Sequence, residues 1–183
     1  SPWYRSSLTR REAVVPLDHV LKPDAALGLP ALTKEQLLTG AEGLYTAAAM
    51  MRIRTAVDFA DPRSGSAGES YSRALMWMAG FEAPELQREI RDSSGLVGYT
   101  DYYWGGVRLA GEFDGVEKYV KPEYLKGRTI SQVVVDEKAR EDRIRALGIG
   151  MVRLVWAELM TAGQLERKLA AAGVPRRRAR SAR

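Results

Sequence analysis

The stretch YTDYYWGGVRLAGEFDGVEK, residues 99–118, predicts two short strands joined by a turn at Gly105-Gly106. Aromatic and β-branched residues flank the two glycines, and a glycine turn of two residues suits a tight hairpin. The predicted register places Trp104 opposite Val107 across that turn. The hairpin is therefore the expected centre of a sheet.

Three carboxylates are predicted to share one face of this hairpin. The register sets Asp101 opposite Ala110, and side chains alternate between the two faces of a strand, so Glu112 and Asp114 point to the same side as Asp101. The apolar side chains that point the other way, into a core, are Val107, Leu109 and Phe113. Crowded like charges destabilise a sheet, and a hard divalent cation with oxygen ligands would resolve the conflict. The pattern predicts a Mg²⁺ or Mn²⁺ site, with an ordinary polar surface as the alternative.

Composition limits the chemistry that is open to the chain. The sequence of 183 residues has a hydrophobic fraction of 45%, which is ample for one packed domain with a helical appendage. It has no cysteine and a single histidine, His19, which excludes thiolate zinc sites and disfavours a metal site built on histidines. The sequence shows no apolar run of 18 residues and no signal-peptide pattern, so we expect no membrane span and a cytoplasmic location.

The net charge of +5 comes from the end of the chain. Residues 174–183 hold five arginines and no acid, so the rest of the chain carries 23 basic and 23 acidic residues. A charge run of this kind is either a solvated end or an arm that binds phosphates, and it gives weak support for a DNA partner. The arginines expected to contact DNA in the second case include Arg176, Arg177 and Arg178.

Three parts are expected along the chain: a helical region over 1–62, an α/β domain over 63–173 and a basic tail over 174–183. Besides the hairpin, the spacing of apolar residues and the caps predict helices over 8–21, 33–40, 45–60, 66–79, 131–147 and 158–172, and strands over 86–91 and 151–156. The order from residue 66 is helix, three strands, helix, strand, helix. This order predicts a mixed sheet with helices on both faces.

Several of these positions together resemble the PD-(D/E)xK nuclease superfamily, in the branch similar to very short patch repair endonucleases that is common in actinobacterial proteins. The residues that carry the resemblance are Glu69-Ser70, Gln87, Asp101, Glu112-Phe113-Asp114-Gly115, Arg140 and Val152-Arg153. The similarity covers about residues 66–159 and implies a restriction-endonuclease-like mixed sheet. Proteins of this branch often carry a winged helix ahead of the nuclease-like part and are similar to abortive-infection antitoxins and regulators. Residues 1–62 are then expected to be the linking helical region.

The resemblance implies a set of catalytic residues: Glu69, Asp101, Glu112, Asp114 and Lys118. Asp101 fills the aspartate of the second strand, and Glu112 fills the D/E position of the third. Asp114 stands where the superfamily lysine usually is, and Thr100 replaces the proline before the first aspartate. Apart from the resemblance, Glu69 also fits a capping box with Ser66.

The mechanism that fits these residues is metal-assisted hydrolysis of DNA, in repair or defence, with Mg²⁺ or Mn²⁺ held by the carboxylates and Lys118 stabilising charge on the phosphate. Gln87, Arg140 and Arg153 are expected to lie near the DNA. A solvated strand residue is the alternative for Gln87, and solvated or salt-bridged arginines, which are commoner than DNA contacts, are the alternative for Arg140 and Arg153. One alternative function is a nuclease-like module without turnover, which binds DNA or a protein partner through its N-terminal region. A metal enzyme that acts on a nucleotide is a weaker one. If the three carboxylates converge closely enough to share a cation, hydrolysis of DNA is favoured over the module without turnover.

Overall fold

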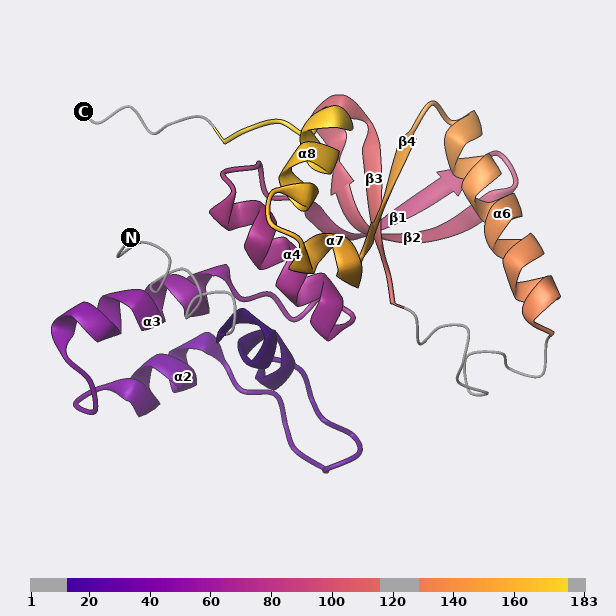
Figure 1. Ribbon diagram of the computed structural model, residues 1–183. Helices are drawn as coiled ribbons and strands as arrows, with labels where there is room; N and C mark the ends of the chain where they lie inside the picture. The colour runs from indigo at the N-terminus through magenta and orange to yellow at the C-terminus, as the bar shows by residue number, and fades with distance from the viewer. Residues whose placement is uncertain (1–12, 116–128, 178–183) are drawn as a thin grey trace. The chain divides into compact units, whose positions relative to one another are not determined.

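The computed structural model describes residues 13–115 and 129–177 (Figure 1). The chain divides into two compact units, residues 1–78 and 79–183. The helix predicted over 66–79 thus belongs to the N-terminal unit, whereas the sequence placed the domain boundary at residue 62. The fold class is confirmed: a mixed sheet of four strands is flanked by helices, and the N-terminal part is helical.

The N-terminal unit is helical, and its helices begin and end close to the positions that the sequence predicts. Residues 13–20 are helical, and α2 (Lys34–Ala41), α3 (Ala47–Phe59) and α4 (Ala67–Met78) follow. Thr33 and Gln36 form a capping box at the start of α2. A buried ion pair, in which Arg73 Nη2 lies 2.8 Å from both carboxylate oxygens of Asp18, ties α4 to the first helix. The unit is thus held together by a charge pair as well as by apolar packing.

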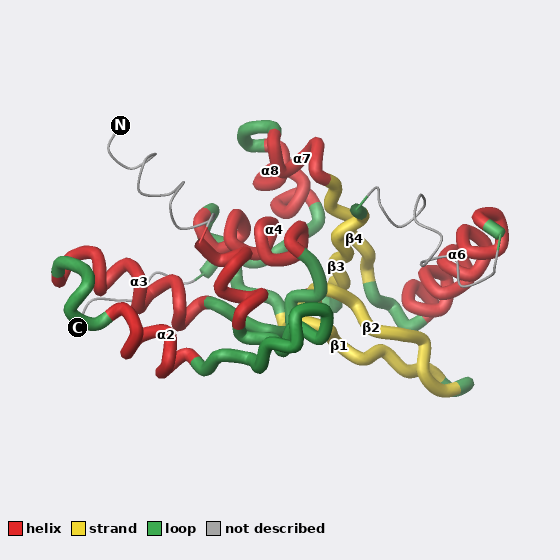
Figure 2. Tube along the Cα trace, turned by 90° about the horizontal axis from the view of Figure 1, so that it is seen from below, coloured by secondary structure: helices red, strands yellow, loops and turns green. Residues whose placement is uncertain are grey.

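The sheet of the C-terminal unit has the order β1-β2-β3-β4. Its strands are β1 (Glu85–Asp92), β2 (Gly95–Trp104), β3 (Leu109–Asp114) and β4 (Gly150–Val155). Strand β2 is antiparallel to both β1 and β3, whereas β4 is parallel to β3, and this parallel pair needs the crossover helix α6 (Ile130–Ala146). Figure 2 shows α6 beside β4, on one side of the strands.

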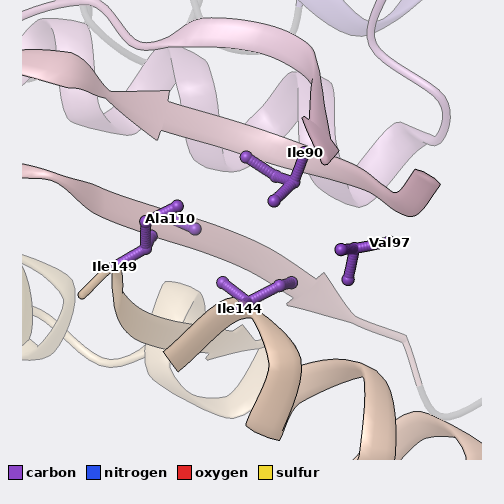
Figure 3. Packing of buried hydrophobic residues seen from close by; sticks show 5 residues of the cluster. All are labelled: Ile90, Val97, Ala110, Ile144 and Ile149. Carbon is purple, nitrogen blue, oxygen red and sulfur yellow. The ribbon is translucent and has the colours of Figure 1, made fainter. Parts of the chain in front are cut away.

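Both faces of the sheet are covered by helices. On one face, Ile144 of α6 packs in a buried cluster with Ala110 of β3; the other members are Ile90, Val97 and Ile149 (Figure 3). On the other face, Phe113 of β3 meets Trp156 edge-on, with ring centroids 5.2 Å apart. Trp156 begins α7 (Trp156–Met160), which is followed by α8 (Gln164–Ala171). The alternation of side chains along β3 therefore points Ala110 to α6 and Phe113 to α7.

The single helix predicted over 158–172 is wrong. The structure has two helices, α7 and α8, separated by residues 161–163. Gly163 caps α8 with a φ of 72°, a left-handed conformation that glycine adopts without strain, so the chain turns there instead of continuing as a helix.

The predicted register of the hairpin is wrong by two residues. Trp104 pairs with Leu109, because the connection is a short 3₁₀ turn, Gly105–Val107, followed by Arg108 in the left-handed region. Arg108 anchors this longer turn by donating to the carbonyl oxygens of residues 147 and 148. Val107, predicted for the core, is 43% exposed in the turn. A shift of two preserves the alternation of faces, so the faces assigned to the carboxylates and to Leu109 and Phe113 are correct.

The predicted basic tail begins inside the folded unit. Val174 is buried, Glu82 N–H donates to Pro175 O over 2.8 Å, and Arg176 forms a bridge with Phe81. The Arg176 guanidinium also lies 3.8 Å from the centroid of the Phe81 ring. Arg176 and Arg177 therefore lie along the segment 80–82, whereas Arg178 lies outside the described residues.

We expect Arg176→Ala to lower the free energy of unfolding by about 1 kcal/mol, because it removes the cation that stacks on the buried Phe81 ring. Urea denaturation of wild type and variant measures the loss. Arg176→Lys keeps a cation and should recover part of it. Equal midpoints in wild type and Arg176→Ala would show that the stacked guanidinium adds no stability.

Candidate functional site

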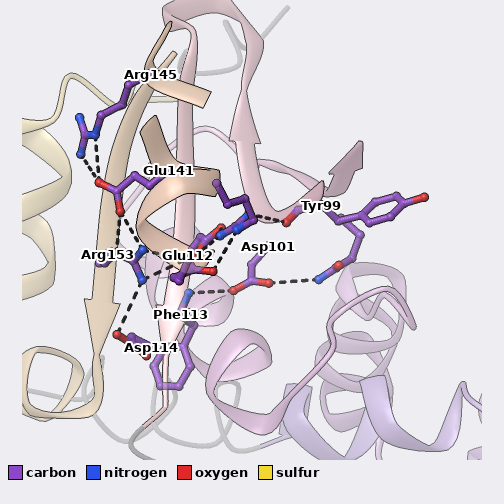
Figure 4. A network of polar contacts seen from close by, with 11 residues as sticks. Tyr99, Asp101, Glu112, Phe113, Asp114, Glu141, Arg145 and Arg153 are labelled. Atoms are coloured by element: carbon purple, nitrogen blue, oxygen red, sulfur yellow. Dashed lines mark hydrogen bonds and ion pairs between the residues drawn. The ribbon is translucent and has the colours of Figure 1, made fainter. Parts of the chain in front are cut away.

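Asp101 and Glu112 lie next to each other at the centre of the sheet. Tyr102 pairs with Gly111, and Asp101 and Glu112 are the next residues outward on β2 and β3. Asp101 is fixed in place, because its Oδ2 accepts the Phe113 N–H over 2.8 Å and its Oδ1 accepts from Gln87 Nε2 over 3.3 Å. Figure 4 shows Asp101, Glu112 and Asp114 together on this face. The sequence therefore predicted correctly which carboxylates share a face.

Gln87 has an unusual backbone. Its φ is 51°, a region that non-glycine residues rarely adopt, and it interrupts the ladder between the pairs Leu86–Tyr102 and Arg88–Thr100. The side-chain amide of Gln87 contacts Asp101 from this position. Gln87 thus lies beside the carboxylates, as predicted, and helps to orient one of them.

Glu112 is buried and is paired with an arginine of α6. Its exposed fraction is 6%, and Arg140 Nη2 donates to its Oε1. Arg140 is itself held by Glu137, one turn earlier on α6, through contacts of 3.0 Å from Nε and 2.8 Å from Nη2. Arg140 Nη1 also donates to Tyr99 O. Gly98 permits this approach, since a Cβ there would lie 3.3 Å from Arg140 Cδ.

Arg153 extends the network from β4. It is the partner of Glu112 in the parallel ladder, and its Nη2 donates to Glu141 over 2.7 Å and to Glu137 over 3.0 Å. Its Nη1 lies 3.9 Å from Glu112 Oε2 and 3.8 Å from Asp114 Oδ2 (Figure 4). Arg153 therefore places positive charge between two of the three predicted metal ligands.

These side chains line an open cleft of about 370 Å³. Its lining residues are Tyr99, Asp101, Glu112, Asp114, Val133, Glu137, Arg140 and Arg153. Four of these residues are acids and two are arginines, so the cleft carries both signs of charge and suits a charged ligand. Acidic side chains of the sheet thus face arginines held by α6 and β4.

The environment moves the pKa values of these groups in opposite directions. Burial raises the pKa of Glu112, although the hydrogen bond from Arg140 works against that rise. The hydrogen bond from Arg140, and less strongly the contact with Arg153, lowers the pKa of Glu137 to about 2. Burial works against the charged form of Arg140, but its bonds to Glu137 and Glu112 dominate and raise its pKa. At neutral pH the two arginines and Glu137 are therefore charged.

The donor chemistry of the cleft fits Mg²⁺ or Mn²⁺, because carboxylate oxygens are the ligands that these hard ions prefer. Yet within residues 13–115 and 129–177 no three acidic or histidine side chains are grouped so as to hold an ion. The cations that Glu112 contacts are the guanidinium groups of Arg140 and Arg153. A metal site at Asp101, Glu112 and Asp114 stays a prediction.

The other predicted residues have separate positions. Glu69 belongs to the N-terminal unit, where it is buried and its Oε2 accepts the Gly65 N–H over 2.6 Å, while Ser66 Oγ accepts the Glu69 N–H. This arrangement agrees with the helix-capping interpretation. Arg73, four residues after Glu69 on α4, forms an ion pair with Asp18. Lys118 lies outside the described residues.

Two acids of α6 also belong to the site. Glu137 and Glu141 were not among the predicted site residues, yet both bind the arginines of the site. The signal was the spacing: Val133, Glu137, Arg140 and Ile144 recur at helical intervals of three and four and so lie on one face of α6. Since Ile144 is fully buried against the sheet, that face is the one that borders the cleft.

Comparisons with known proteins give a limited relationship. The chain is 35% identical over 104 residues to two uncharacterized proteins of Mycobacterium tuberculosis, one from strain CDC 1551 / Oshkosh and one from strain H37Rv. The match covers 50% of this chain and 38% of each relative, so the chain spans well under half the length of these relatives. No family model and no solved structure matches. Among the described helices, none is long and apolar enough to cross a membrane.

The pKa of Glu137 predicts how stability depends on pH. A folded-state pKa near 2 lies below the usual value of 4.5, so this stabilisation is present above about pH 4.5 and is lost as the pH falls towards 2. Glu137→Gln should therefore be less stable than wild type at about pH 7, and the difference should shrink at about pH 3. Denaturation midpoints at both pH values measure it. A difference that stays constant would contradict the ionic role of Glu137.

Proposed function

We propose that the protein hydrolyses phosphodiester bonds of DNA in a reaction that depends on Mg²⁺ or Mn²⁺, with the cleft at Asp101, Glu112 and Asp114 as the active site. The observation that carries the proposal is that β2 and β3 turn Asp101 and Glu112 to the same open cleft. The resemblance to the PD-(D/E)xK nuclease superfamily supports it, because the order of elements that it implies agrees with the observed order of α4, three strands, α6 and β4. A cytoplasmic location and DNA as the partner are parts of the same proposal.

In this mechanism Asp101 and Glu112 would hold the ion, and Asp114 would complete its coordination or accept a proton from water. A bound metal ion would polarise the phosphate and lower the pKa of a water ligand. Asp101 is already oriented by the Phe113 N–H. Arg140 and Arg153 carry the positive charge that a phosphate group needs, and their planar guanidinium groups suit its oxygens. Lys118 is proposed to stabilise charge on the phosphate as well.

A second candidate is a nuclease-like module that binds DNA or a protein partner without turnover, in a regulator or an antitoxin. The pairing of Glu112 with Arg140 favours it, because a carboxylate that already has a cation needs no metal to be stable. Gln87, Arg176, Arg177 and Arg178 would then serve as DNA contacts, and the N-terminal region would bind the partner.

A cleavage assay separates the two candidates. Wild-type protein is expected to nick or cut DNA slowly when Mg²⁺ or Mn²⁺ is present. Asp101→Asn and Glu112→Gln should each lower the rate about a hundredfold or more, because each removes a charged group at the reacting phosphate. Lys118→Ala should have a smaller effect. Single- and double-stranded DNA are incubated with each variant, with and without metal, and products are resolved on gels.

The matched control for this assay is Glu85→Gln, which removes a carboxylate from an exposed position of β1. Its rate should equal that of wild type. DNA binding without cleavage by the wild type in any metal would reject the nuclease proposal in favour of the second candidate. Cleavage that persists in Glu112→Gln would show that the site lies elsewhere.

The arginines at the end of the chain are proposed to add affinity for DNA that does not depend on its sequence. Deleting residues 178–183 removes three arginines and no acid, and it spares the segment 174–177 that pairs with 80–82. The slope of log affinity against log salt should become less steep by up to about 3 units. Fluorescence anisotropy with labelled duplex DNA at several salt concentrations measures the slope. An unchanged slope would show that these arginines do not contact phosphates.

A further inference from the structure

Arg140 divides its contacts between two carboxylates of different elements. Glu137, on the same helix, takes two of them, from Nε at 3.0 Å and from Nη2 at 2.8 Å. Glu112, on β3, accepts from Nη2 as well. The bond to Glu112 therefore joins α6 to the sheet, whereas the bonds to Glu137 stay within α6.

The two carboxylates depend on Arg140 to different degrees. Glu137 also accepts from Arg153 Nη2 over 3.0 Å, so it has a second cation at hydrogen-bond distance. For Glu112 the second cation is Arg153 Nη1, which lies 3.9 Å from Oε2, beyond a hydrogen bond. Arg153 is itself fixed by Glu141 at 2.7 Å. Arg140 is thus the principal counter-charge of the buried Glu112.

A divalent ion that binds Glu112 would have to compete with this guanidinium. Two cations on one buried carboxylate repel each other, and the repulsion is poorly screened away from water. Arg140 need not leave the cleft when it releases Glu112, because Glu137 holds it through Nε and Nη2 from one turn earlier on the same helix.

We propose that Arg140 is an exchangeable counter-cation of Glu112: its guanidinium neutralises Glu112 when no metal is bound, and a divalent metal ion displaces it from Glu112 while Glu137 retains it. The inference rests on the metal site of the proposed function. It assigns Arg140 as a positioning residue that sets how tightly the metal binds.

Calorimetric titration with Mn²⁺ tests the exchange. Arg140→Gln removes the competing cation and should bind Mn²⁺ about tenfold more tightly than wild type, since a hydrogen bond to a charged group no longer has to be broken. Arg145→Gln is the matched control. It removes the same charge from α6, but Arg145 pairs with Glu141 and does not line the cleft, so its affinity for Mn²⁺ should equal that of wild type.

A second measurement follows the exchange in the wild type itself. In protein labelled with ¹⁵N-arginine, the Nε–H resonance of Arg140 should shift and saturate as Mg²⁺ is added, while that of Arg145 stays in place. Arg140→Lys, which keeps a cation at this position, assigns the resonance.

The outcomes separate this inference from the proposed function. Equal Mn²⁺ affinities in wild type and Arg140→Gln, or an Arg140 resonance that Mg²⁺ does not move, would overturn the exchange and leave the metal-dependent function in place. Absence of metal binding in wild type and in every variant would overturn both. A tenfold gain in Arg140→Gln alone, together with the selective shift of the Arg140 resonance, supports the exchange.

Discussion

The ion pair between Glu112 and Arg140 is the interaction on which the arrangement of the cleft depends. Glu112 has an exposed fraction of only 6%, and a charged carboxylate at that depth needs a cation or a hydrogen-bond donor. Removing one partner of a buried ion pair typically costs about 3 to 5 kcal/mol, whereas an exposed pair such as Arg145–Glu141 is worth at most about 1 kcal/mol. The Glu112–Arg140 pair joins α6 to β3, and loss of Arg140 would leave the buried Glu112 without its nearest cation, whereas the Arg145–Glu141 pair stays within α6.

The alternation of charge through the network explains why so many ionisable groups can share one cleft. Glu112, Arg140, Glu137, Arg153 and Glu141 follow one another in contact, and each arginine lies between two acids. The elements that supply them are β3, α6 and β4, so the network also joins the parallel strand pair to its crossover helix. The same groups that stabilise the fold are thus those that a phosphate or a metal ion would meet.

The sequence was sufficient for those features that depend on local chemistry. The caps of α2 and α4, the alternation along β2 and β3 and the parity of Asp101 and Glu112 follow from residue type and spacing alone. The face of each side chain was predicted correctly although the register was wrong by two residues, because a shift of two leaves every side chain on the same face. This is why the face that carries the carboxylates was predicted while the turn was not.

The features that the sequence did not provide depend on contacts between distant residues. The turn after Trp104 is lengthened by Arg108, which binds carbonyl groups near residue 148, and the segment 174–177 pairs with 80–82. The partners of Glu112 are likewise 28 positions away on α6 and opposite on β4. Propensity and spacing identify candidate charges, but which charges meet is decided by packing.

A crystal structure of the protein soaked in Mn²⁺, with anomalous diffraction data, tests the central claim most directly. The account predicts an anomalous peak at the carboxylates of Asp101 and Glu112, with Arg140 turned from Glu112 and still bound to Glu137. A cleft without such a peak, in which Arg140 and Glu112 remain paired at saturating Mn²⁺, would contradict it.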